Sequence, residues 1–110
     1  MADNVTIGAV MERMPAMFLP EKAQGVEAVI QFHFTGEGAG DWVLKVAGGA
    51  CTVAPGSTEA PKLTITSDAS DYVDIALGKL EAMSAFAAGK IKLQGDLALA
   101  MKLMGFFRRS

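Results

Sequence analysis

The chain has 110 residues, of which 51 % are apolar and 20 % charged, and its formal net charge is −2. This length suits one domain, residues 1–110, and the apolar content excludes a disordered chain. The longest unbroken apolar stretch, residues 97–101, is far shorter than the roughly 20 residues of a membrane-spanning helix, and residues 1–20 show no signal peptide. The small net charge gives no reason to expect a nucleic-acid partner. A domain this small buries only about two thirds of its unfolded surface, so we expect some apolar side chains to serve something besides the core.

The N-terminal segment predicts one amphipathic helix. Apolar residues recur over residues 7–14 at the i, i+3, i+4, i+7 spacing of a helix with one apolar face. Asn4 and Thr6 are both suited to cap its N-terminus. Pro15 disfavours helical geometry in the residue before it, so we expect the helix to end or kink there.

Alternating apolar and polar residues follow this helix. They predict strands over residues 26–35, 41–46, 50–54 and 62–66. The Gly48-Gly49 pair suits a two-residue hairpin turn. Consecutive hairpins of this kind predict an antiparallel meander.

Beyond the fourth strand the apolar period becomes helical. Asp68 is a suitable N-cap for a short helix that Gly78 closes, and Gly89 closes a second short helix. Residues 90–94 alternate as a fifth strand with its lysines outward, and Asp96 caps a last helix. The elements together predict an α+β fold with a five-stranded, mainly antiparallel sheet.

The last helix is unusually apolar. Over residues 97–107 the only charged side chain is Lys102. Ala98, Lys102, Gly105 and Arg109 form a narrow small-or-polar strip on the helical wheel, and the remaining positions are apolar. A helix that is apolar nearly all round is buried on several sides. The protein core, a dimer partner, a membrane and a bound apolar ligand all remain candidates for what covers it.

The chemistry-bearing residues argue against an enzyme. Cys51 is the only cysteine, and it lies in an apolar strand with no basic neighbour, as a core thiol does. His33 is the only histidine and is expected on the solvated strand face. Zinc sites built from these residue types need more ligands, and no phosphate-binding glycine loop is present. We therefore expect no catalysis, no metal site and no cofactor. A lone cysteine also favours a reducing compartment.

Charge is unevenly distributed along the chain. Residues 1–78 hold ten acidic and four basic side chains, whereas residues 79–110 hold two acidic and six basic ones. The basic end either complements the dipole of the last helix or meets an anionic surface. The second reading predicts that the chain docks transiently to anionic membranes through Lys90, Lys92, Arg108 and Arg109.

Several motifs resemble the sterol carrier protein type 2 family. Residues 89–103, GKIKLQGDLALAMKL, match the family ending G-K-[LI]-K-x-x-G-[ND]-x-x-L-A-[ML]-K-L. DWVLKV at residues 41–46, followed by Gly48-Gly49, resembles the family's tryptophan-bearing strand and its turn. LTIT at residues 63–66, then Asp68, Gly78-Lys79 and Ala85-Phe86, fall in the family's order and spacing. The resemblance covers about residues 6–107.

The resemblance implies five strands in one sheet, helices covering one face, and an apolar cavity between sheet and helices. Family members bind fatty acids, fatty acyl-CoA, sterols and related lipids, and some transfer lipids between membranes. The resemblance thus implies an intracellular lipid-binding or transfer protein. The family's positions place five apolar residues in the cavity wall: Trp42, Phe86, Leu97, Met101 and Met104. Periodicity adds four more: Phe32, Ile75, Leu77 and Met83.

Two departures from the family bear on this reading. The chain ends in Phe107-Arg108-Arg109-Ser110 and lacks the peroxisomal tripeptide of many eukaryotic members, so the resemblance implies a cytoplasmic, bacterial-type domain. Residues 80–83 replace an Asn-Pro step common in relatives, so ligand preference is not carried over.

The last helix and the apolar edge formed by Met11, Met14, Met17 and Phe18 are expected to act as a movable lid. Two alternatives stay open: a homodimeric interaction module that hides the last helix, and an accessory domain of a lipid-metabolising enzyme without catalysis of its own.

Overall fold

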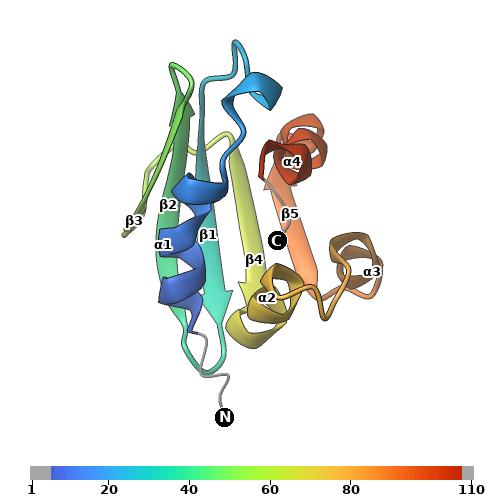
Figure 1. Cartoon of the computed structure of the whole chain (residues 1–110). Coiled ribbons are helices and arrows are strands. Elements are labelled where there is room, and N and C mark those ends of the chain that lie inside the picture. Colours follow the sequence, from blue (N-terminus) through green and yellow to red (C-terminus); the bar gives the residue numbers. More distant parts are fainter. Residues whose placement is uncertain (1–5, 108–110) are drawn as a thin grey trace.

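A five-stranded sheet is the frame of the molecule (Figure 1). The structure, a computed structural model, describes residues 6–107, apart from the side chain of Met104. The strands are β1 (Ala28–Thr35), β2 (Gly40–Ala47), β3 (Ala50–Pro55), β4 (Leu63–Asp68) and β5 (Ile91–Gly95), in the spatial order β3-β2-β1-β4-β5. Only the β1–β4 pair is parallel. The predicted α+β fold with a mainly antiparallel sheet is confirmed.

The predicted meander is wrong at one connection. β4 does not pair with β3, because the chain after β3 crosses the open face of the sheet and joins β1 on its other side. Gln31 anchors this crossing, as it is buried on the face away from the helices. Its Nε2 donates to the carbonyls of Trp42 at 3.1 Å and Gly56 at 3.2 Å, and its Oε1 accepts from the Thr58 N–H at 2.8 Å. Alternation along a strand reports which face is buried, not which strand lies beside it.

In the described part of the chain, four α-helices cover one face of the sheet (Figure 1). They are α1 (Ile7–Met17), α2 (Ala69–Ala76), α3 (Ala82–Ala87) and α4 (Leu97–Leu103), with short 3₁₀ turns η1 (Pro20–Lys22) and η2 (Met104–Phe106). α1 packs at the β3 side, whereas α2, α3 and α4 pack against β4 and β5. The covering helices are therefore divided between the two halves of the sheet.

Helix α1 continues past Pro15, so of the two outcomes expected there, the end of the helix is wrong. Thr6 caps it by accepting a hydrogen bond from the Ala9 N–H at 3.1 Å; Asn4 lies outside the described residues. Pro15 stands inside the helix, which ends only at Met17. Proline removes one N–H from the last turn, and the Phe18 N–H closes that turn onto the Pro15 carbonyl at 3.3 Å. The rest of α1 is stabilised by the packing of its earlier turns, which are buried.

The two aspartate caps are confirmed. Asp68 Oδ1 accepts from the Ser70 hydroxyl at 2.6 Å and the Ser70 N–H at 2.9 Å. These bonds hold the pKa of Asp68 below its usual 3.8. Asp96 Oδ1 accepts from the Leu99 N–H at 3.0 Å at the start of α4. The last helix is shorter than predicted, because α4 tightens into η2 after Leu103.

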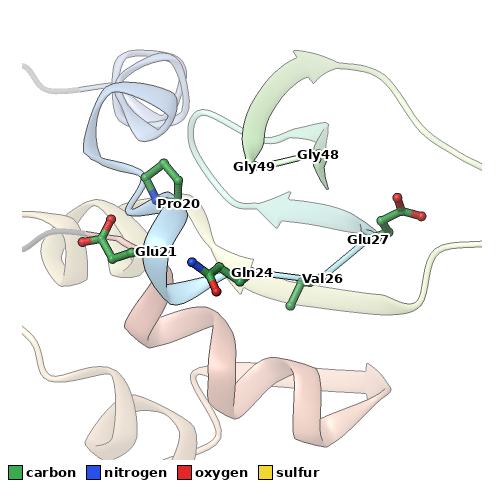
Figure 2. A pocket seen from close by; sticks show the side chains of 8 residues that line it. Pro20, Glu21, Gln24, Val26, Glu27, Gly48 and Gly49 are labelled. Atoms are coloured by element: carbon green, nitrogen blue, oxygen red, sulfur yellow. The ribbon is translucent and has the colours of Figure 1, made fainter.

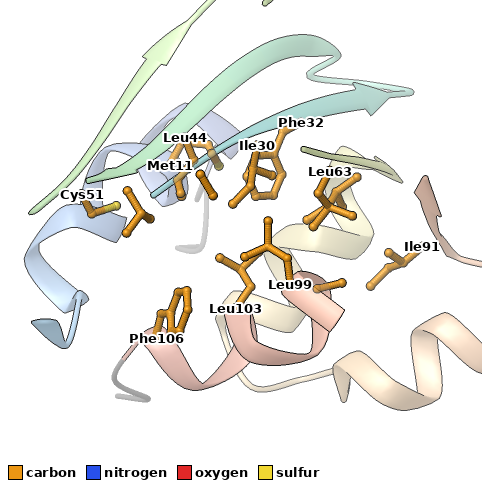
Figure 3. Close-up of a cluster of buried hydrophobic side chains, with 14 of the residues drawn as sticks. Met11, Ile30, Phe32, Leu44, Cys51, Leu63, Ile91, Leu99, Leu103 and Phe106 are labelled. Carbon is orange, nitrogen blue, oxygen red and sulfur yellow. The ribbon is translucent and has the colours of Figure 1, made fainter. Parts of the chain in front are cut away.

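The core lies between the sheet and the helices (Figure 3). Ile30, Leu44 and Leu63 from the sheet are completely buried, as is Met11 from α1. Side chains of α4 and η2 close the core from the C-terminal side: Leu99, Leu103 and Phe106. One continuous cluster thus joins the first helix to the last.

Candidate functional site

Three of the nine predicted lipid-contacting residues belong to the core or its border. Phe32 is fully buried, and its ring centroid lies 5.6 Å from those of both Phe34 and Tyr72. Trp42 is its cross-strand partner on β2 and is half-buried beside Gly8 of α1. Ile75 on α2 is also half-buried and packs against the core. These three residues line the helix-covered face of the sheet.

Five other predicted residues form what we call the apolar helix surface. They are large apolar side chains that the fold leaves exposed: Leu77 (43 %), Met83 (45 %), Phe86 (45 %), Leu97 (54 %) and Met101 (61 %). They come from the C-terminal end of α2, from α3 and from α4, all on the β4–β5 half of the molecule (Figure 1). The ninth predicted residue is Met104, whose side chain lies outside the described part of the structure.

The exposure of these residues follows from helix geometry. α4 turns Leu99, Ala100 and Leu103 toward the sheet, so Leu97 and Met101, one turn apart, face away from it. In α3 only Ala85 is fully buried. The larger side chains of that helix remain half in solvent. Single apolar residues on a surface are ordinary, but five large ones on the same half of the molecule are unusual.

The described residues also line two hollows at the surface, and neither is lined by a predicted residue. The larger, of about 590 Å³, lies between the chain leading into β1 and the β2–β3 turn, as Figure 2 shows. It is lined by Pro20, Glu21, Gln24, Gly25, Val26, Glu27, Gly48 and Gly49. The smaller, of about 340 Å³, is lined by Lys22, Gln24, Val26, Lys102, Gly105 and Phe106. Sequence reasoning did not anticipate them, although the glycines that leave the larger one unfilled are visible in the sequence. The apolar cavity between sheet and helices stays a prediction.

Cys51 and His33 point to opposite sides of the sheet. Cys51 is buried on the helix-covered face, and burial raises the pKa of its thiol to about 11. The thiol is therefore neutral near pH 7, which does not suit a nucleophile. His33 is exposed on the other face, where Nδ1 lies 2.5 Å from Asp41 Oδ1. Within residues 6–107, no group of three or more His, Cys, Asp or Glu side chains is arranged to hold a metal ion.

The lysines predicted to meet membranes lie on different faces. Lys90 Nζ is 4.0 Å from Asp71 Oδ1 of α2, which places it beside the helices. Lys92 is exposed on the open sheet face, since its neighbours Ile91 and Leu93 pack toward the core. The two predicted arginines, 108 and 109, lie outside the described residues.

The predicted lid elements are joined to each other. Phe18, just after α1, forms an isolated antiparallel bridge with Phe107, and the Leu19 N–H donates to the Phe106 carbonyl at 2.7 Å. The Phe18 ring lies 5.7 Å from the Phe107 ring. Met11 is completely buried, while Met14 and Phe18 are half-buried against the core. The same contacts join the C-terminal segment to the end of α1.

The family model of the SCP-2 sterol transfer family matches residues 9–108. The chain belongs to this family. The resemblance found in the sequence is thereby confirmed, and the chain is a lipid-binding or lipid-transfer domain by family membership. In the described part of this SCP-2 family domain, no helix is both long and apolar enough to cross a membrane.

Individual relatives show how widely the domain is distributed. Hydroxysteroid dehydrogenase-like protein 2 of Danio rerio is 33 % identical over 106 residues, covering 93 % of this chain and 26 % of the relative. Sterol carrier protein 2 of Homo sapiens is 42 % identical over 62 residues, covering 56 % of this chain and 11 % of the relative. The palmitated SCP2L2 of Aedes aegypti has a TM-score of 0.77 at 28 % identity, covering 90 % of this chain and 91 % of that one. The chain spans about a quarter or less of the length of the curated relatives that it matches.

Proposed function

We propose that the chain binds one apolar lipid, a fatty acid, a fatty acyl-CoA or a sterol-like molecule, against the side chains that α3 and α4 expose on the apolar helix surface. The observation that carries the proposal is the apolar helix surface, where five large apolar side chains remain exposed to water. The palmitated state of the Aedes aegypti relative supports a fatty acid as one ligand class.

Helix α3 is the element best suited to move aside for the ligand. It has six residues, and Ala85 is the only one of them that is fully buried. Few buried apolar contacts mean a low free energy of local opening. A small rotation of α3 turns Met83 and Phe86 inward, where a bound hydrocarbon chain replaces water around them. α4 and η2 are anchored by Leu99, Leu103 and Phe106, so α3 replaces the last helix as our proposed moving wall.

Burial of the hydrocarbon chain supplies the binding free energy. About 14 methylenes at about 0.8 kcal/mol each contribute roughly 11 kcal/mol. Loss of ligand freedom and ordering of side chains offset several kcal/mol of this. The remainder is close to the roughly 8 kcal/mol that corresponds to a micromolar Kd. Thioether side chains such as Met83 and Met101 adapt to irregular ligand shapes, which favours a broad lipid range.

A fluorescent fatty acid titrated into the delipidated full chain tests this site. We expect saturable micromolar binding by the unmodified chain and loss of at least tenfold in affinity for Met101→Arg and for Phe86→Arg, since a guanidinium placed against the hydrocarbon is costly to desolvate. Ala98→Arg is the matched control, because it adds the same charge to the exposed side of α4 without removing an apolar side chain.

Two outcomes decide the matter. If Met101→Arg and Phe86→Arg bind as tightly as the Ala98→Arg control and the unmodified chain while circular dichroism shows an intact fold, the ligand does not contact the apolar helix surface. If the unmodified chain binds no fatty acid, acyl-CoA or sterol, the proposed function itself is wrong. Mass spectrometry of an organic extract of freshly purified protein identifies the natural ligand class.

A second candidate is an accessory lipid-binding domain of an enzyme. This chain matches only 26 % of the length of hydroxysteroid dehydrogenase-like protein 2 of Danio rerio, which favours that role. We propose that the chain itself performs no catalysis, supported by the neutral, buried thiol of Cys51. We also propose a cytoplasmic location, because a cysteine without a disulfide partner, such as Cys51, is compatible with a reducing compartment. Light scattering on delipidated protein tests the homodimer alternative.

A further inference from the structure

We infer that Met83 and Met101 are sites of reversible oxidation to methionine sulfoxide by a hydroperoxide, and that their oxidation weakens the binding of lipid. This inference rests on the proposed function, because it assigns a means of control to side chains that contact the ligand. It goes beyond that function by naming a covalent modification and the two atoms that carry it, the Sδ atoms of Met83 and Met101.

The first argument is that the methionine side chains differ in exposure to solvent. Of the five that the structure describes, Met101 is 61 % exposed and Met83 is 45 % exposed, whereas Met11 is completely buried. Met14 and Met17 of α1 are half-buried. Oxidation of a thioether requires contact between its sulfur and the oxidant, so the susceptibility of a methionine follows its exposure. Met83 and Met101 are therefore expected to react first among these five.

The second argument is that a hydrogen bond engages the sulfur of one α1 methionine. The Tyr72 hydroxyl donates to Met14 Sδ at 4.0 Å. Such a bond is weak, but it occupies a lone pair of the sulfur, and a sulfur lone pair is the group that attacks a peroxide. The methionines of α1 are thus shielded by burial and, at Met14, by this bond as well.

The reaction transfers one oxygen atom to the sulfur. With hydrogen peroxide as the oxidant, a sulfur lone pair attacks one peroxide oxygen, the O–O bond breaks and an S–O bond forms. The proton on the transferred oxygen passes to the departing hydroxide, which leaves as water. The sulfur loses two electrons and the peroxide gains them. In the reverse direction, two thiols supply two electrons through a methionine sulfoxide reductase, are oxidised to a disulfide, and the oxygen leaves as water.

Oxidation changes the chemistry of the proposed binding surface. Met83 and Met101 are two of the five apolar side chains of the apolar helix surface. A sulfoxide oxygen is a polar acceptor, and it loses its water when a hydrocarbon chain covers it. Neither side chain belongs to the core cluster, so the fold does not depend on their oxidation state. Oxidation is therefore expected to lower the lipid affinity about tenfold or more and to leave the fold intact.

Peptide mass spectrometry tests the modification sites. The delipidated full chain is treated with hydrogen peroxide, and the sulfoxide at each methionine is measured over time. Met83 and Met101 should oxidise first, and Met11 should oxidise at least about tenfold more slowly than Met101, because Met11 reacts only after local opening of the core. Saturation with a fatty acid should slow the oxidation of Met83 and Met101 severalfold, since bound hydrocarbon excludes the peroxide from them.

Leucine variants test the effect on lipid binding. The double variant Met83→Leu, Met101→Leu removes both exposed thioethers and keeps apolar side chains of similar volume. The matched control Met14→Leu, Met17→Leu removes two thioethers from α1 instead. For each chain, the Kd of a fluorescent fatty acid is measured before and after the same peroxide treatment. The ratio of the two Kd values should be about ten or more for the unmodified chain and the control, and about one for Met83→Leu, Met101→Leu. Methionine sulfoxide reductases with a dithiol should restore the first Kd, and circular dichroism should show the same fold throughout.

Oxidation of Met11 as fast as that of Met101 overturns the assignment of the sites. Equal Kd ratios for the two double variants overturn the link between these sites and lipid affinity, and a Kd that the reductases do not restore overturns reversibility. If the unoxidised chain binds no fatty acid, acyl-CoA or sterol, the proposed function is refuted together with the effect of oxidation on binding. Faster oxidation of Met83 and Met101 in that case still supports them as the modification sites, so the two failures are distinguishable.

Discussion

Replacing Gln31 with Ala is expected to destabilise the fold by about 3 kcal/mol, because Gln31 holds the crossing that places β4 beside β1. The side chain is only 8 % exposed. Its Nε2 donates to the carbonyls of Phe32, Trp42 and Gly56, and its Oε1 accepts from the Thr58 N–H, at 2.8–3.2 Å. A net hydrogen bond contributes about 1 kcal/mol, and partners left without water add to the loss. For a chain of this size that corresponds to a melting temperature lower by roughly 12 °C.

Urea denaturation followed by circular dichroism measures this loss. Gln94→Ala is the matched control, since Gln94 is the same residue type on β5 but is exposed. It should change the free energy of unfolding by less than about 0.5 kcal/mol. If Gln31→Ala is as stable as the control, the crossing does not depend on Gln31 and the reasoning from buried hydrogen bonds is refuted.

Three further outcomes follow from local geometry. Gly95→Ala should cost at least about 3 kcal/mol, because Gly95 has φ +113° and an added Cβ would lie 2.5 Å from the Lys62 carbonyl oxygen; Gly105→Ala, with open space around it, should be nearly neutral in the same melts. Cys51 should react with a thiol reagent at pH 8 only after denaturation, since burial raises its pKa to about 11; fast labelling of the native chain would contradict its buried place. The lowered pKa of Asp68 stabilises the fold above pH 3.8, and this contribution is lost as pH falls through the folded-state pKa. The melting temperatures of unmodified protein and Asp68→Ala should therefore differ at pH 7 and converge in acid; a constant difference would argue against the cap.

Local signals in the sequence were sufficient for most elements. Gly48-Gly49 closes a hairpin whose two strands lie as predicted, and the glycines occupy positive φ values of 59° and 78° that other residues rarely adopt. Asp68 and Asp96 start helices as expected. These features depend on neighbours within a few residues, so the sequence carries them directly. The end of α1 was harder, because packing of its buried turns outweighed the local effect of Pro15.

The candidate site could be predicted only in part. All nine predicted residues are apolar, and apolar type does not distinguish Phe32, which is completely buried, from Met101, which is 61 % exposed. Likewise, Lys90 and Lys92 stand two residues apart but lie beside the helices and on the open sheet face, respectively. The difference arises because Lys90 precedes the strand and turns toward Asp71, whereas Lys92 alternates within it.

By itself, then, the sequence determined the order of the elements, the caps, the β2–β3 hairpin and the apolar surplus of the C-terminal third, since all of these follow from short-range patterns and composition. The tertiary structure alone decided that β4 lies parallel to β1 and that the surplus divides into a buried row at Leu99 and Leu103 and an exposed row at Leu97 and Met101. Strand neighbours are chosen by contacts between distant segments, such as those of Gln31 with the crossing chain. A helix buries whichever side meets the sheet, and that side is known only once the sheet is assembled.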